Sequence, residues 1–85
     1  MKKDDLHSRL DALSAEIDKT RSTLKQHENW TDGHRLSAGE LEARYRYLKD
    51  ELDQEVRDLE AHGERVSDLE ISVRKWIDGL FLKAE

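Results

Sequence analysis

A heptad pattern of apolar residues constrains the fold of this chain more than any other feature of its sequence. Steps of four and three separate Leu6, Leu10, Leu13 and Ile17, and the pattern returns at Leu24. Two apolar positions in every seven place a narrow apolar seam along one face of a helix, as in coiled coils. The sequence therefore predicts that the first part of the chain is a helix packed along this seam.

The same spacing resumes after residue 40 and continues almost to the end of the chain. The second seam consists of Leu41, Tyr45, Leu48, Leu52, Glu55, Leu59, His62, Val66, Leu69, Val73, Trp76 and Leu80. Charged residues make up 41% of the chain and hydrophobic residues 35%, a balance found in disordered chains and in coiled coils. Ten of the twelve leucines lie on the two seams, which excludes disorder. We therefore predict an all-α protein with a single helical domain over residues 1–85.

Residues 27–40 interrupt the pattern and predict the connection between two helices. We expect the first helix at residues 4–28, a loop at 29–37 and the second helix at 38–62. Asn29 tolerates the left-handed conformation that often ends a helix. The connection is short enough for the two helices to pack as an antiparallel hairpin.

Ser37 and Glu40 have the spacing of a capping box at the start of the second helix. In this motif each side chain accepts a hydrogen bond from a free backbone N–H near the other residue. Leu36 and Leu41 stand where a hydrophobic staple would enclose the box. We therefore expect Ser37 to be the N-cap residue.

Two architectures accommodate the apolar residues that follow position 62. In the first, the second helix extends over residues 38–82 as a coiled coil, kinked or broken near Gly63. The heptad phase passes through Gly63 without a slip, and an interior glycine costs only about 1 kcal/mol relative to alanine. The alternative is a compact three-helix bundle, with a separate helix at 64–82. The narrow seam of the first helix favours the long helix, because a helix that faces two others needs a wider apolar stripe.

A long second helix would leave its last turns uncovered, because the first helix is too short to reach them. The apolar residues there are Val73, Trp76, Ile77, Leu80 and Phe81. An uncovered apolar surface marks an association site. The sequence therefore predicts a homodimer with this interface.

Glu55 and His62 occupy seam positions that are normally apolar. They have the chemistry of an acid–base pair, but polar residues in a coiled-coil seam usually fix the register or the number of chains. We therefore assign a register role to both residues and predict no catalytic residues.

The interrupted stretch contains His27, Glu28, Asp32 and His34, which are all possible zinc ligands. Their spacing does not place two histidines on one helical turn, as helical zinc motifs do. The turn between two helices accounts for the stretch without a metal. We predict neither a metal site nor a cofactor.

The net charge of −5 argues against nucleic acid as a partner, because an acidic chain repels phosphates. The exception is the stretch ARYRYLK at residues 43–49, which alternates basic and aromatic side chains.

The C-terminal stretch lacks the basic face of a membrane-surface helix. No apolar run reaches the roughly 20 residues that span a bilayer, so we expect a cytoplasmic location.

The sequence predicts a non-enzymatic helical protein-interaction or adaptor protein that self-associates through coiled-coil packing. It presents its helix faces to a protein partner whose identity the sequence does not specify. The alternative function is a small regulator that contacts nucleic acid through residues 43–49.

Overall fold

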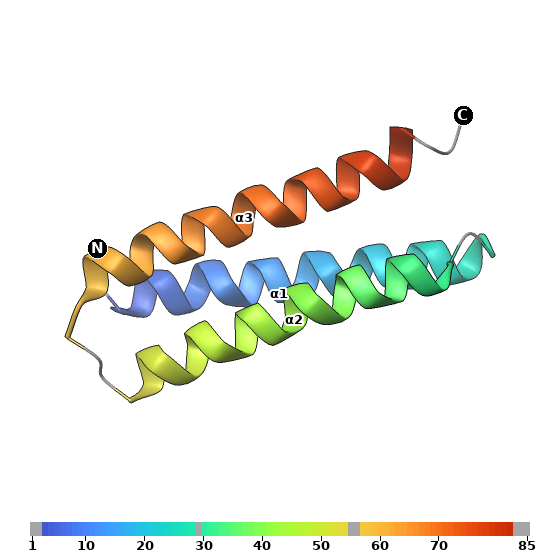
Figure 1. Ribbon diagram of the computed structural model, residues 1–85. Coiled ribbons are helices and arrows are strands. Elements are labelled where there is room, and N and C mark those ends of the chain that lie inside the picture. Colours follow the sequence, from blue (N-terminus) through green and yellow to red (C-terminus); the bar gives the residue numbers. More distant parts are fainter. Residues whose placement is uncertain (1–2, 29, 55–56, 83–85) are drawn as a thin grey trace.

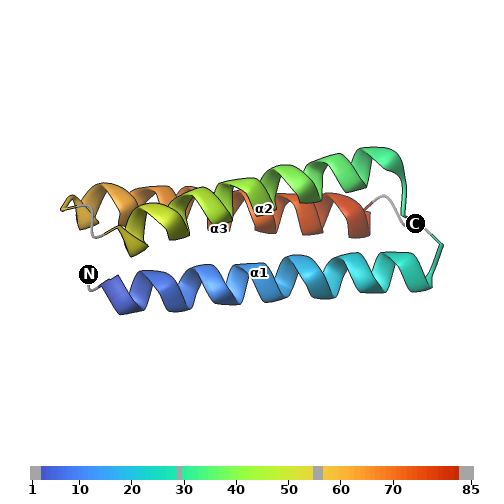
Figure 2. The ribbon, with the colours of Figure 1, turned by 90° about the horizontal axis from the view of Figure 1, so that it is seen from below.

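Three α-helices form the protein in the computed structural model, which describes residues 3–28, 30–54 and 57–82, with side chains up to Leu80. Helix α1 spans Lys3–Gln26, α2 spans Asp32–Asp53 and α3 spans Leu59–Leu82. Helix α2 runs antiparallel to α1, and α3 returns parallel to α1 (Figures 1 and 2). Each helix packs against both others in a bundle 44 Å long and 18 by 17 Å across. The all-α prediction is confirmed in its three-helix form.

The predicted continuous helix over residues 38–82 is wrong, because the second seam is divided between α2 and α3. The N–H of Gln54 donates to the carbonyl oxygen of Asp50 at 3.0 Å, and the chain then leaves α2. Asp58 caps α3 because its Oδ1 accepts the backbone N–H of Ala61 at 3.2 Å. Aspartate is one of the preferred residues for this position.

The break lies before Leu59 and not at Gly63, which is buried inside α3. Leu52 and Leu59 are seven positions apart, so the heptad phase is the same on both sides of the break. Because the chain turns before Leu59, all of α3 runs back along the bundle. Most of the apolar residues of the second seam are then buried within a single chain, and Tyr45, Leu59 and Trp76 are half-buried.

The connection between α1 and α2 is shorter than the predicted loop. Glu28 adopts the left-handed conformation, with φ 57°, and its N–H donates to the carbonyl of Lys25 at 3.2 Å. This residue directly precedes Asn29, the predicted left-handed position, which lies outside the described residues.

Thr31, and not Ser37, is the N-cap of α2. Its Oγ1 accepts the N–H of His34 at 3.4 Å, and its carbonyl accepts the N–H of Arg35 at 3.0 Å. Threonine can supply this cap as serine does, and the turn expected at Asp32-Gly33 is instead the first turn of the helix. The capping-box prediction is wrong, because Ser37 and Glu40 lie inside α2.

The core contains the two predicted seams. Its buried residues are Leu6, Leu10, Leu13, Ile17, Ala38, Leu41, Leu48, Leu52, Val66, Leu69 and Val73. Burying a leucine side chain contributes about 1.5–3 kcal/mol. The periodicity therefore identified the residues that hold the three helices together.

Polar contacts outside the core connect specific turns of the helices. Arg9 of α1 donates to Ser67 Oγ and Glu70 Oε2 of α3, each at 3.1 Å. Tyr45 of α2 donates its hydroxyl hydrogen to Asp11 Oδ1 of α1 at 3.1 Å. These contacts are compatible with only one longitudinal register of the helices.

Candidate interaction surface

The two tyrosines of residues 43–49 lie on different sides of α2. Tyr45 faces α1, where it binds Asp11, and it accepts a hydrogen bond from Lys49 Nζ at 3.3 Å. Tyr47 faces outward and is 61% exposed. The alternation of basic and aromatic residues is therefore not one continuous surface.

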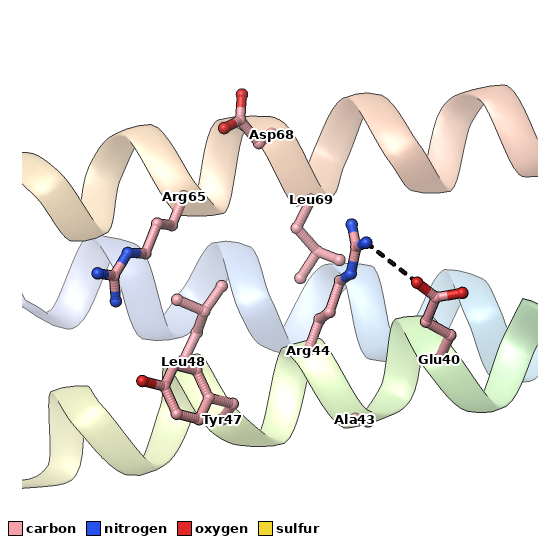
Figure 3. A pocket seen from close by; sticks show the side chains of 8 residues that line it. All are labelled: Glu40, Ala43, Arg44, Tyr47, Leu48, Arg65, Asp68 and Leu69. Carbon is pink, nitrogen blue, oxygen red and sulfur yellow. Dashed lines mark hydrogen bonds and ion pairs between the residues drawn. The ribbon is translucent and has the colours of Figure 1, made fainter.

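A groove of about 430 Å³ lies between α2 and α3, beside Tyr47 (Figure 3). Leu48 of α2 and Leu69 of α3 point toward each other across it. Its other lining residues are Glu40, Ala43, Arg44, Tyr47, Arg65 and Asp68. Arg44 extends across the groove and donates to Glu40 Oε1 at 3.0 Å. The groove thus combines an apolar floor with charges of both signs on its edges.

Four residues form an apolar stripe on the outer side of α2, and we call Leu36, Gly39, Ala43 and Tyr47 the α2 stripe. Their spacings of three, four and four residues place them within about 80° of arc on the helix. Leu36 is 76% exposed, and it shares with Tyr47 and Ile71 the highest exposures among the large hydrophobic residues described. The stripe lies opposite the side of α2 that carries the buried leucines, so α1 and α3 leave it uncovered.

Glu51 connects the edge of the groove to the interior of the bundle. Its Oε2 lies 2.7 Å from His62 Nε2 and accepts a hydrogen bond from Arg65 Nη1 at 2.6 Å. The hydroxyl of Tyr47 lowers the pKa of the Glu51 carboxyl, with further contributions from His62 and Arg65, while desolvation opposes them. The same hydrogen bond raises the pKa of Tyr47, because the carboxylate holds its proton.

His62 is buried on the seam, with 3% of its surface exposed. Its Nδ1 donates to the carbonyl oxygen of Asp58 at 2.7 Å, while Nε2 faces the Glu51 carboxylate. The position of His62 between α2 and α3 supports the register interpretation, which stays a prediction. Glu55, the other predicted register residue, lies outside the described residues.

The predicted dimer interface near the C-terminus is largely part of the protein's own core. Val73 is fully buried, and Leu80 is 7% exposed. Trp76 and Ile77 are half-buried and pack against the core, and the side chain of Phe81 is outside the description. The premise that the last turns are uncovered is therefore wrong for Val73 and Leu80, because a separate α3 brings them against α1 and α2, while the interface itself stays a prediction.

The possible zinc ligands of the interrupted stretch do not assemble in the part of the chain that the structure describes. Among these residues, no group of three His, Cys, Asp or Glu side chains is placed to hold a metal ion. The ring of His34 lies 6.4 Å from that of Trp30, at an interplanar angle of 48°. His27 and Glu28 belong to the turn that ends α1.

Over the described ranges, none of the helices combines the length and apolar character that a membrane span requires.

Comparisons with family models, curated proteins and solved structures give no match for this chain. Its function therefore has to be inferred from the geometry of its own surface. The α2 stripe was missed at the sequence level, because Leu36 was assigned to a hydrophobic staple and Tyr47 to a basic-aromatic stretch. The signal was present as the 36-39-43-47 spacing, which becomes informative once α2 is known to begin at Asp32.

Proposed function

We propose that this protein is a helical protein-interaction module that self-associates by helix packing. The observation that carries the proposal is the α2 stripe. Single exposed apolar residues are common on protein surfaces, but contiguous apolar patches often mark interaction sites. Leu36 and Tyr47, with the small residues between them, form such a patch on a helix whose opposite side already fills the core.

The physical basis of the proposed association is the packing of one helix against another. Side chains on one helix occupy the grooves between side chains on its neighbour, and small residues allow the axes to approach closely. Gly39 and Ala43 provide this close approach on α2. The adjacent groove between α2 and α3 can receive a side chain from the incoming helix.

The alternative of nucleic-acid binding has less support from the geometry. An exposed Tyr47 next to Arg44 and Arg65 is a reasonable stacking and phosphate site in isolation. Each arginine, however, is paired with a carboxylate, Arg44 with Glu40 at 3.0 Å and Arg65 with Glu51 at 2.6 Å. A salt-sensitive mobility shift of a labelled single-stranded oligonucleotide, lost in Tyr47→Ala, would favour this alternative.

Sedimentation velocity over a range of concentrations tests the proposed self-association. The wild-type protein should show a concentration-dependent increase in mass. The variant Leu36→Glu with Ala43→Glu should stay monomeric, because it places two carboxylates on the α2 stripe. Both positions are exposed, so circular dichroism should show an unchanged helix content.

A matched variant controls for added negative charge. Ala15→Glu with Ile71→Glu adds the same two carboxylates at exposed positions of α1 and α3. This control should associate like the wild-type protein. A wild-type protein that stays monomeric at every concentration, or a control that loses association as fully as the stripe variant, would contradict the proposal.

A further inference from the structure

We infer that the α2 stripe is covered by α2 of a second copy, packed antiparallel about a two-fold axis near Gly39 and Ala43. This inference rests on the proposed self-association and specifies the partner and its orientation. A two-fold interface uses the same surface on both copies, so that surface has to be complementary to itself. The α2 stripe meets this condition in its apolar residues and in its charges.

The apolar residues are complementary when the two helices run in opposite directions. Leu36 and Tyr47 are the two large residues of the stripe, eleven positions or about 16 Å apart along the helix. In the antiparallel arrangement, Leu36 of each copy packs against Tyr47 of the other. The small residues Gly39 and Ala43 then lie near the axis, where the two helices come closest.

Gly39 gives this arrangement further support. A Cβ atom at this position would meet nothing within 4 Å, so packing inside the monomer does not require a glycine here. Glycine in a helix interior is nevertheless destabilising relative to alanine. Close contact with a second helix provides a reason for a small residue in the middle of an exposed helix face. Gly79 has similarly open surroundings, so this observation supports the inference only together with the stripe.

The charges beside the stripe are also self-complementary in the antiparallel direction. When Leu36 lies opposite Tyr47 of the second copy, Glu40 of one copy comes next to Arg44 of the other. The two side chains are 67% and 54% exposed, so both can reach a second copy. A parallel two-fold pairing brings opposite edges of the stripe together and would place Arg44 next to Arg46 of the second copy. Like charges across an interface disfavour that orientation.

A second pair of charges on the other edge of the stripe follows the same rule. Arg35 approaches Asp50 of the second copy in the antiparallel arrangement, and both residues are exposed in the monomer. Arg46 stands one turn before Asp50 and shares this edge, and Asp32 of the second copy also comes opposite Asp50, so this edge brings charges of both signs together. The opposite charges on the edge with Glu40 and Arg44 thus favour one direction of α2 relative to its copy.

Cysteine cross-linking tests the direction, because the natural chain has no cysteine. Two single variants, Leu36→Cys and Tyr47→Cys, are oxidised separately and as an equal mixture. A disulfide requires Cα atoms within about 7 Å. The antiparallel arrangement predicts a disulfide-linked dimer in the mixture, with little in either variant alone, because equivalent residues lie far from the axis.

A second pair of variants, Arg35→Cys and Asp50→Cys, keeps the four stripe residues intact and should behave in the same way. Cross-linking of the single variants alone would show parallel helices and overturn the inference. Association in the ultracentrifuge without cross-linking in any sample would also overturn it, while leaving the proposed self-association standing. A wild-type protein that does not associate would instead contradict the proposed function.

Discussion

At the scale of single residues, Glu51 connects more parts of the structure than any other side chain described above. Its carboxylate meets the buried His62, the exposed Arg65 and the hydroxyl of Tyr47, which belongs to the α2 stripe. It therefore joins α2 to α3 at the end of the bundle where the chain turns between them. The first turn of α1, with Lys3, Asp4 and Asp5, lies at the same end (Figure 1).

The lowered pKa of Glu51 predicts a loss of stability in acid. Because the folded state lowers this pKa, the carboxylate stabilises the fold above its ordinary pKa, and this contribution is lost as the pH falls through the folded value. Urea unfolding at a series of pH values from about 6 down to about 3 should show a smaller acid-dependent loss for Glu51→Gln than for wild type.

The variant Glu64→Gln is the control for this measurement, since it removes a carboxylate from an exposed position of α3. It should retain the wild-type dependence on pH. Identical curves for wild type and Glu51→Gln would show that the contacts of this carboxylate do not contribute to stability.

At the scale of the helices, the sequence predicts the core well, but it predicts the start of α2 and the break between α2 and α3 poorly. Periodicity identifies buried positions because it reports which side of a helix is apolar. Periodicity cannot reveal a turn that preserves the heptad phase. The turn between Leu52 and Leu59 preserves this phase, so the pattern gives no sign of it. Local capping chemistry does give a sign, and Asp58 begins α3 through such a cap.

The start of α2 was missed for a related reason. Thr31 and Ser37 are both good N-cap residues, and Ser37 also has a glutamate three positions later, as a capping box requires. The structure uses the earlier cap and thereby gains more than one turn of helix. The surface that carries Leu36 exists only because α2 begins early, so the α2 stripe could not be predicted from the misplaced boundary.

Alanine substitutions at the two candidate caps distinguish the boundaries. Thr31→Ala should lower the free energy of unfolding by about 1 kcal/mol, because the N–H of His34 loses its acceptor. Ser37→Ala should have little effect or a slightly stabilising one, because alanine has the higher helix propensity. Thermal or urea unfolding of the two variants measures the difference, and a larger loss in Ser37→Ala would place the helix start at residue 38.

At the scale of the whole molecule, three helices bury both seams and leave an apolar stripe on one of them. Val73 and Leu80, which a long helix would have left for a second chain, are instead buried inside the bundle, and Trp76 and Ile77 are half-buried against the core. Folding back therefore covers much of the surface on which the predicted C-terminal interface depends. The α2 stripe remains, and its charges belong to exposed residues that the core does not need.

Reversing these charges gives a further test of the antiparallel dimer. In Glu40→Arg, the new arginine lies next to Arg44 of the second copy. In Arg44→Glu, the new glutamate lies next to Glu40 of the second copy. Each variant alone should therefore associate more weakly than wild type, because like charges face each other. An equal mixture should restore association, because the introduced arginine of one variant then meets the introduced glutamate of the other, and the unchanged Arg44 meets the unchanged Glu40. Exposed ion pairs contribute about 0.2–1 kcal/mol each, so two symmetric pairs predict a roughly twofold to thirtyfold difference in Kd.

Sedimentation velocity of the separate variants and their mixture, at low and high salt, makes the measurement. High salt should reduce the differences because it screens exposed charges. A mixture that associates no better than its components would mean that Glu40 and Arg44 do not face each other across the interface. The within-helix pair between these residues, at 3.0 Å in the monomer, is lost equally in both variants. Its loss would lower helix stability in each sample alike and cannot produce recovery on mixing, so recovery would have to come from contacts between two copies.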